Sequence, residues 1–171
     1  MYRDATRELF NLRATAKFAY GAHKGQMRRG GEEEYYAHCL RVYQSLLAAG
    51  IPCEEASIGL LHDVVEDTEH TLESVKEALP FLKDSVLEAL DLLTKREDQT
   101  RNEYLSRLAS SENSLAILCK SYDAYDNHKM SPEGRKFTKE VLKRNPDKES
   151  QKYLELSKDL LELYEVLEKY S

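Results

Sequence analysis

Apolar residues recur at three- and four-residue intervals along most of this chain, the spacing that places them on one face of an α-helix. The pattern predicts helices over about residues 4–26 and 36–49, and a third from Pro52 into the pair His62-Asp63. Later helices are predicted to begin at Thr71 and Pro80 and to cover about residues 102–109, 114–127, 137–143 and 150–170. Because no segment shows a clear β pattern, the sequence predicts an all-α protein.

The chain length predicts a single domain. Its 171 residues are enough to bury a full hydrophobic core, and it has no internal repeat or low-complexity tract. We therefore expect a single-domain helical bundle over residues 1–171. The last predicted helix carries an amphipathic stripe of leucines, which would pack either on this core or on a partner subunit. Packing on the core is the favoured interpretation; the other arrangement would make a homo-oligomer.

Composition narrows the classes of function. A net charge of -6 and a pI near 5.5 argue against general nucleic-acid binding, which normally needs a basic face. A small anionic ligand stays compatible, because a metal ion and a few cations can reverse the field inside a pocket. No apolar run approaches the roughly 20 residues that span a bilayer, and the N-terminus lacks the apolar stretch of a secretory signal. Cys39, Cys53 and Cys119 form no CxxC pair, which indicates reduced, mostly buried thiols in a cytoplasmic protein.

The segment LLHDVVEDT, residues 60–68, holds most of the candidate chemistry. His62 and Asp63 follow an apolar run directly, and Glu66 and Asp67 come about one helical turn later. Residues three and four apart share a helix face, so Asp63, Glu66 and Asp67 would line one side and repel each other. A divalent cation would relieve that repulsion, whereas the alternative is a solvated acidic helix end. The apolar residues before the cluster favour burial and hence the cation.

A second polar group follows another apolar run, in the segment CKSYDAYDN, residues 119–127. Asp123 and Asn127 would lie one turn apart on one helix face, with Lys120 one turn before Asp123. A lysine in such a place needs a carboxylate or an anionic ligand. By itself, this pattern is also explained by an Asp123 that caps a helix or forms an ion pair.

His38 completes a candidate metal-binding group. Together with His62, Asp63 and Asp123 it supplies two imidazoles and two carboxylates. This mixture suits manganese, iron or zinc, and its oxygen ligands favour Mn²⁺ over Fe²⁺ and Zn²⁺. A lone histidine is more often a core or surface residue, so His38 counts only in this combination. There is no HExxH motif and no cluster of cysteines, which argues against a thiolate zinc site.

The order H…HD…D resembles that of the HD-domain metal-dependent phosphohydrolases, and more narrowly the hydrolase domain of the RelA/SpoT family and its small stand-alone relatives. Five stretches carry the resemblance in order: AHKGQMRRGG (22–31), YYAHCLRV (35–42), GLLHDVVEDTEHT (59–71), LLTK (92–95) and KSYDAYDN (120–127). Among them, HDVVEDT is specific to this branch, whereas a bare HD is not. The resemblance covers about residues 14–127 and implies the HD-domain fold. Residues 128–171 would add C-terminal helices that match no family motif.

The resemblance also implies a role for each matching residue. His38, His62, Asp63 and Asp123 would hold one manganese ion, and Glu66 and Asp67 would position and activate the attacking water. On the substrate side, Arg28 would pack against the nucleobase and Arg29 would face phosphate. Lys120 and Asn127 would touch the substrate or support the site. Tyr104 would lie near the nucleotide. Two positions depart from the family pattern, Ala124 where arginine is frequent and Cys39 where proline usually follows the ligand histidine. Neither departure removes a ligand.

The implied activity is removal of the 3′-pyrophosphate of guanosine tetra- or pentaphosphate, (p)ppGpp, which gives GDP or GTP and pyrophosphate. The metal would lower the pKa of its bound water, and an adjacent carboxylate would take the proton. At this length we expect a hydrolase without a synthetase domain. Two main alternatives stay open: an enzyme that removes phosphate from NADPH or from a 3′-phosphorylated nucleotide, and a non-catalytic HD domain that binds a nucleotide. A purely structural helical adaptor is the least favoured.

Overall fold

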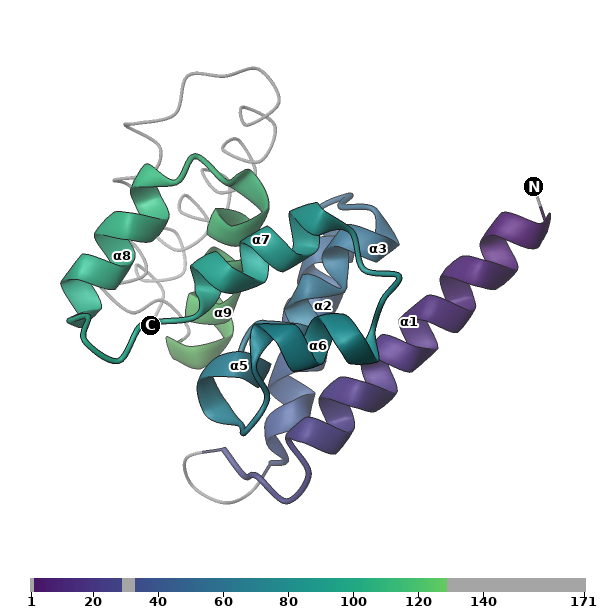
Figure 1. Cartoon of the computed structure of the whole chain (residues 1–171), viewed down its shortest axis with the longest axis horizontal. Helices are drawn as coiled ribbons and strands as arrows, with labels where there is room; N and C mark the ends of the chain where they lie inside the picture. Colours follow the sequence, from purple (N-terminus) through teal and green to yellow (C-terminus); the bar gives the residue numbers. More distant parts are fainter. Residues whose placement is uncertain (1, 29–32, 129–171) are drawn as a thin grey trace, which may run out of the picture. The chain divides into compact units, whose positions relative to one another are not determined.

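The computed structural model describes residues 2–28 and 33–128. Within these ranges every regular element is a helix, apart from one isolated bridge that pairs Met27 with Glu34 (Figure 1). The prediction of an all-α protein is therefore confirmed. The helices predicted over 137–143 and 150–170 lie outside the described residues. The chain divides into two compact units, Met1–Thr94 and Lys95–Ser171, and its organisation as a single domain stays a prediction.

The first unit is built around a short buried helix, α4. Its helices are α1 (Tyr2–Ala22), α2 (Tyr35–Ala48), α3 (Cys53–Ala56), α4 (Ile58–Leu61), α5 (Val64–Asp67), α6 (Leu72–Ala78) and α7 (Asp84–Leu93). Helix α4 contacts α1, α2, α3 and α7, and all of its residues are buried. Around it, α1 and α2 also contact α3, and α6 contacts α7 (Figure 1). The segment that carries the His-Asp pair therefore leaves directly from the core.

A glycine caps the end of helix α2. Gly50 has a φ of +82°, a conformation that costs glycine little. The Gly50 N–H donates to the Leu47 carbonyl at 2.9 Å and the Ile51 N–H donates to the Leu46 carbonyl at 3.1 Å. These two bonds form a Schellman motif, which satisfies carbonyls at the helix end.

The segment that follows Pro52 was expected to form one helix, and this prediction is wrong. It forms three helices of four residues each, α3, α4 and α5, which are interrupted at Ser57 and at His62-Asp63. The Ser57 hydroxyl donates to the Glu54 carbonyl at 2.6 Å, and the His62 ring nitrogen Nδ1 lies 2.8 Å from the Gly59 carbonyl oxygen. Side chains that occupy backbone carbonyls in this way compete with the helical ladder. Because of these breaks, His62 and Asp63 lie on a turn between helices rather than inside one.

Two other helix boundaries also differ from the prediction. Helix α1 ends at Ala22 and not near residue 26, because the chain turns at Gly25, whose φ is +80°. Helix α7 begins at Asp84 and not at Pro80. Helix ends are the least certain part of any pattern-based assignment, since fraying and turns displace them by a few residues.

The second unit contains α8 (Arg101–Ser110) and α9 (Ser114–His128) within its described residues. Helix α8 begins with a capping box: the Thr100 hydroxyl accepts from the Glu103 N–H, and the Glu103 carboxylate accepts from the Thr100 N–H. The two helices contact each other. Residues 116–119 of α9 are buried, and they lead directly into the segment that carries Lys120, Asp123 and Asn127.

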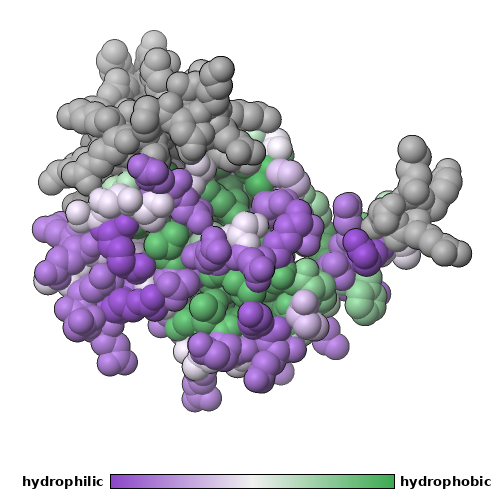
Figure 2. Space-filling view, turned by 45° about the horizontal axis from the view of Figure 1, so that its top comes forward, coloured by the Kyte–Doolittle hydropathy of each residue, from purple (hydrophilic) through white to green (hydrophobic). Residues whose placement is uncertain are grey.

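On the face shown in Figure 2, hydrophilic residues surround apolar ones that gather toward the middle of the view. The most exposed large apolar side chains among the described residues are Leu9 and Phe10 of α1, at 67% and 69% exposure. In the described part of the chain, no helix is both long enough and apolar enough to cross a membrane.

Candidate active site

Three of the predicted metal ligands meet inside the first unit. His38 projects from α2, whereas His62 and Asp63 lie on the turn between α4 and α5. Their ligand atoms are within 4.8 Å of one another. Oδ2 of Asp63 is 2.9 Å from Nε2 of His62 and 3.8 Å from Nε2 of His38. All three residues are buried, so the structure places two imidazoles and a carboxylate around one point with little access to bulk water.

The close packing of α4 on α2 brings these residues together. Gly59 lies against the α2 backbone, and a Cβ atom at this position would be 2.5 Å from the Tyr43 nitrogen. Only a residue without a side chain allows this approach. The two imidazole rings, from His38 before Tyr43 and His62 after Gly59, then pack edge to face with centroids 5.2 Å apart. The glycine thus sets the spacing of the two histidines.

The hydrogen bond of His62 orients its ring for metal binding. A carbonyl oxygen can only accept, so Nδ1 of His62 carries a hydrogen and donates to the Gly59 carbonyl at 2.8 Å. In a neutral ring, Nε2 then presents a lone pair toward Oδ2 of Asp63, which is itself an acceptor. Metal-bound histidines commonly donate their second nitrogen to a backbone carbonyl in this way. The donor set therefore fits a divalent cation, which would satisfy both groups at once.

Tyr35 also belongs to this site, a role that the sequence pattern did not predict. Its hydroxyl lies 2.7 Å from Oδ2 of Asp63 and 2.9 Å from Oδ2 of Asp67. Burial, followed by the charge and hydrogen bond of Asp63 and then those of Asp67, raises the pKa of Tyr35 above its ordinary value. The hydroxyl is therefore a donor throughout the neutral range. One feature of the sequence could have indicated this role: Tyr35 lies in YYAHCLRV, three residues before His38 and on the same helix face.

The two predicted water-handling acids, Glu66 and Asp67, close helix α5 and are both exposed. Asp67 is held at two points, since its carboxylate accepts from Tyr35 and its backbone carbonyl accepts from Nε2 of Gln26 at 2.8 Å. Gln26 in turn is fixed by His23, whose Nδ1 lies 2.8 Å from Oε1 of Gln26. The glutamine of the AHKGQ segment thus reaches the end of α5.

Arg28 lies beside the same tyrosine. Its guanidinium carbon is 5.8 Å from the centre of the Tyr35 ring, within the range of a cation–π contact. Its backbone N–H donates to the Glu33 carbonyl at 2.8 Å. Arg29, the predicted phosphate-facing residue, lies outside the described residues.

The remaining predicted site residues gather in the second unit. Asp123 is 2% exposed, and its two carboxylate oxygens have different partners. Oδ2 lies 2.6 Å from Nζ of Lys120, and Oδ1 accepts from the side-chain amide of Asn127. The Lys120 ammonium also lies 5.6 Å from the centre of the buried Tyr104 ring. The ion pair considered for Asp123 is therefore present, and Lys120 and Asn127 both support this carboxylate.

Known proteins resemble the chain in sequence. No family model matches it. A guanosine-3′,5′-bis(diphosphate) 3′-pyrophosphohydrolase of Aquifex aeolicus is 34% identical over 116 residues, which cover 66% of this chain and 16% of that protein. A protein of the same name from Haemophilus influenzae is 33% identical over 115 residues, covering 64% of this chain and 17% of that protein. The chain is a homologue of the RelA/SpoT-type ppGpp hydrolases.

The fold of this RelA/SpoT homologue agrees with that relationship. A solved structure, described as a metazoan ortholog of SpoT that hydrolyzes ppGpp and plays a role in starvation responses, matches with a TM-score of 0.62. The match covers 86% of this chain and 93% of that chain at 20% identity, so it shows a shared HD-type fold. The chain spans about one sixth of the length of the two bacterial proteins, and what those whole proteins do is therefore a proposal for this chain.

The two departures from the RelA/SpoT-type pattern have simple local settings. Cys39 is fully buried next to His38, and Ala124 is half-buried next to Asp123. In the described residues, the candidate ligands beside them keep the contacts given above. The structure therefore shows no displaced ligand at either position.

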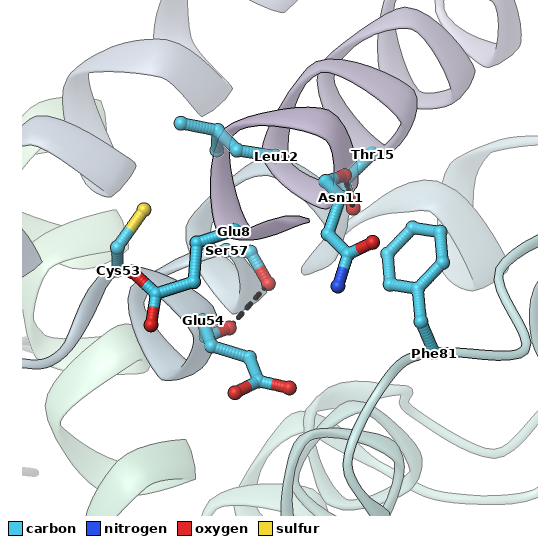
Figure 3. A pocket seen from close by; sticks show the side chains of 8 residues that line it. All are labelled: Glu8, Asn11, Leu12, Thr15, Cys53, Glu54, Ser57 and Phe81. Atoms are coloured by element: carbon cyan, nitrogen blue, oxygen red, sulfur yellow. Dashed lines mark hydrogen bonds between the residues drawn. The ribbon is translucent and has the colours of Figure 1, made fainter. Parts of the chain in front are cut away.

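A separate surface pocket lies in the first unit (Figure 3). Its lining comes from α1, from α3 and the turn after it, and from the segment before α7: Glu8, Asn11, Leu12, Thr15, Cys53, Glu54, Ser57 and Phe81. None of these lining residues is among those predicted for the metal or the substrate. The pocket is thus a different feature from the His-Asp group, and it gives the RelA/SpoT-type assignment no support.

Proposed function

We propose that this chain is a metal-dependent phosphohydrolase that removes the 3′-pyrophosphate of guanosine tetra- or pentaphosphate. The reaction would use one water molecule and give pyrophosphate with GDP or GTP. The observation that carries the proposal is the buried meeting of His38, His62 and Asp63, in which Nε2 of His62 lies 2.9 Å from Oδ2 of Asp63. The names of the bacterial relatives support the choice of substrate.

Mn²⁺ is the proposed cofactor, with Asp123 as the fourth protein ligand. A bound divalent ion supplies a water of lowered pKa and polarises a phosphoryl oxygen. Two imidazoles with two carboxylates form a mixed donor set in which the oxygens favour Mn²⁺ over the softer Zn²⁺. Asp123 suits this role because Lys120 and Asn127 orient its carboxylate, as outer residues do for metal-ligating carboxylates.

Glu66 and Asp67 are the proposed acids that position the attacking water and take its proton. A general base must lie within hydrogen-bond reach of the proton that it removes. Asp67 shares the Tyr35 hydroxyl with Asp63, so its carboxylate is held next to a proposed metal ligand while it stays exposed. Glu66 is the neighbouring exposed acid at the end of α5.

The proposed substrate contacts combine cations with aromatic rings. Arg28, whose guanidinium carbon is 5.8 Å from the centre of the Tyr35 ring, offers a planar group that can pack on a purine base. Arg29 would face phosphate, and Lys120, Asn127 and Tyr104 would line the substrate side of Asp123. These local cations matter because the chain as a whole has a net charge of -6. A cytoplasmic location and a homo-oligomer stay predictions of the sequence.

A substrate panel tests the proposal. The full chain, stripped of metal and reloaded with Mn²⁺, is incubated with ppGpp, pppGpp, NADPH and 3′-phosphorylated nucleotides, and the products are separated by ion-exchange chromatography. We expect pyrophosphate with GDP or GTP, and no turnover by Asp63→Asn. Inorganic phosphate released from NADPH or from a 3′-phosphate would instead favour the alternative hydrolase. Tight nucleotide binding without turnover in Mn²⁺, Fe²⁺ or Zn²⁺ would favour a non-catalytic HD domain.

A further inference from the structure

The Tyr35 hydroxyl lies between two carboxylates that have separate proposed tasks. It is 2.7 Å from Oδ2 of Asp63, a proposed metal ligand, and 2.9 Å from Oδ2 of Asp67, a proposed water-handling acid. Ionised carboxylates can only accept hydrogen bonds, so the phenol is the donor, and its single hydrogen is given to one carboxylate or shared between the two. Without a donor between them, the two negative charges would repel each other. The hydroxyl therefore favours an arrangement in which the two carboxylates stay close.

The ring of Tyr35 is itself held in place from several sides. Tyr35 is the first residue of α2, and its backbone N–H donates to the Gln26 carbonyl at 2.9 Å. Its ring centroid is 5.0 Å from that of His23 and 5.7 Å from that of His38. These contacts restrict the rotation of the ring, so the hydroxyl is directed by the fold and not only by its two acceptors.

The end of α5 depends on such outside contacts. Helix α5 has only four residues, too few to be stable by itself. The Gln26 side chain donates to the Asp67 carbonyl at 2.8 Å, and this bond joins residues 41 positions apart. Asp67 is exposed, so its side chain would otherwise be free to turn toward water. Among the described residues, Tyr35 is the one whose side chain donates a hydrogen bond to the Asp67 carboxylate.

We propose that Tyr35 is a positioning residue, whose hydroxyl keeps the Asp67 carboxylate beside Asp63 in the orientation that the reaction needs. This inference rests on the proposed hydrolase function. Tyr35 donates no group to the reaction and acts through Asp67. Its ring also supports Arg28, so removal of the hydroxyl alone should leave substrate binding intact while it weakens the chemical step.

Four variants of the full chain test the proposal: Tyr35→Phe, Asp67→Asn, the double variant of both, and Tyr36→Phe. Tyr36 is the matched control, since it is the next residue of α2 and its ring packs edge-on against Tyr20. Tyr35→Phe should lower kcat for ppGpp by about 10- to 100-fold with KM within about twofold, the size expected when a reacting group is misplaced. Tyr36→Phe should behave as wild type. Because Tyr35 acts through Asp67, the double variant should be no slower than Asp67→Asn.

Mn²⁺ affinity gives a further readout. Measured by electron paramagnetic resonance of the free ion, it should fall by up to about 10- to 100-fold in Tyr35→Phe, because the hydroxyl is hydrogen-bonded to the proposed ligand Asp63, so kcat is compared at saturating Mn²⁺. A kcat that returns to the wild-type value at saturating Mn²⁺, a changed KM with normal kcat, or losses that multiply in the double variant would each overturn the proposal. If thermal melts show that Tyr35→Phe is less stable, all four variants are compared at a temperature at which each is folded.

An activity-independent measurement distinguishes failure of this inference from failure of the proposed function. Hydrogen exchange of the peptide that contains α5 should be faster in Tyr35→Phe than in Tyr36→Phe, because the hydrogen bond from the Tyr35 hydroxyl to the Asp67 carboxylate is lost. If wild type hydrolyses nothing in the substrate panel, the proposed function fails, but the exchange result still decides whether Tyr35 fixes the end of α5. Equal exchange in the two variants would overturn the positioning role.

Discussion

The backbones of Gly59 and Tyr43 touch where α4 crosses α2. A Cβ atom on Gly59 would lie 2.5 Å from the Tyr43 nitrogen and 2.7 Å from its Cα, and neither backbone atom can move without moving α2. Gly59 has a second task, because its carbonyl accepts from the His62 ring and thereby fixes the nitrogen that faces Asp63. One residue thus controls both the spacing of the histidines and the orientation of one ring.

Replacement of Gly59 by alanine should therefore destabilise the protein. The added methyl group meets backbone atoms, and overpacking of this kind costs about 1–3 kcal/mol. The measurement is urea unfolding followed by circular dichroism. Gly21→Ala is the matched control, since nothing lies within 4 Å of a Cβ there and the residue is inside α1. The control should gain about 0.5–1 kcal/mol, the usual benefit of alanine over glycine in a helix. Equal stability of the two variants would contradict the packing argument.

Asp63→Asn should weaken Mn²⁺ binding by at least about tenfold, because a neutral carboxamide is a poorer ligand for a hard cation than a carboxylate. Isothermal titration of the metal-free chain with Mn²⁺ measures the effect. Asp84→Asn serves as the control, since Asp84 is exposed in the first turn of α7 and belongs to no metal group among the described residues. Unchanged affinity in Asp63→Asn would remove this residue from the proposed ligands.

Lys120→Met should destabilise the second unit. The Asp123 side chain is 3% exposed, and the substitution removes the ammonium 2.6 Å from its Oδ2. A buried charge left without its partner costs about 1–3 kcal/mol or more. The readout is hydrogen exchange of the α9 amides in the full chain. Adding Asp123→Asn to Lys120→Met should restore part of the protection, because the uncompensated charge is then gone. Lys17→Met, on the exposed side of α1, should leave α9 unchanged.

The α8 cap should depend on pH. The hydrogen bonds from the Thr100 backbone and side chain lower the pKa of Glu103 from its ordinary 4.5. A lowered pKa in the folded state means that the charged carboxylate stabilises the fold. That stabilisation is complete above the unfolded-state pKa and is lost as the pH falls through the folded-state value. A carboxyl-carbon NMR titration should show Glu103 titrating below 4.5. Glu103→Gln should remove this contribution; an ordinary or raised Glu103 pKa would argue against the capping box.

Several features could be predicted from the sequence because their causes are local. Helical periodicity reports which face of a segment is buried, and Gly50 satisfies the end of α2 through residues within five positions of it. The continuous helix predicted after Pro52 failed for a different reason. Periodicity could not show that the Ser57 and His62 side chains take backbone carbonyls from the ladder.

The role of Tyr35 could not be predicted either. Its acceptors Asp63 and Asp67 lie 28 and 32 positions away, and no pattern in the sequence pairs a tyrosine with two particular acids over such distances. The glutamine that holds the Asp67 carbonyl is 41 positions from it. Such pairs depend on how α2 and the preceding turn pack against the end of α5, which is a property of the folded unit.

The sequence by itself determined the helical class and the residues able to hold a metal or carry a proton. The reason is that residue types and their spacing determine which positions are buried and what chemistry the side chains offer. Only the tertiary structure decided which of them meet. It placed His38 beside His62 through the glycine contact of α4 and α2, set the His62 tautomer, and put one tyrosine hydroxyl between Asp63 and Asp67. The physical reason is that hydrogen bonds and metal sites need distances within a few tenths of an ångström. Such distances between residues remote in sequence are set by packing.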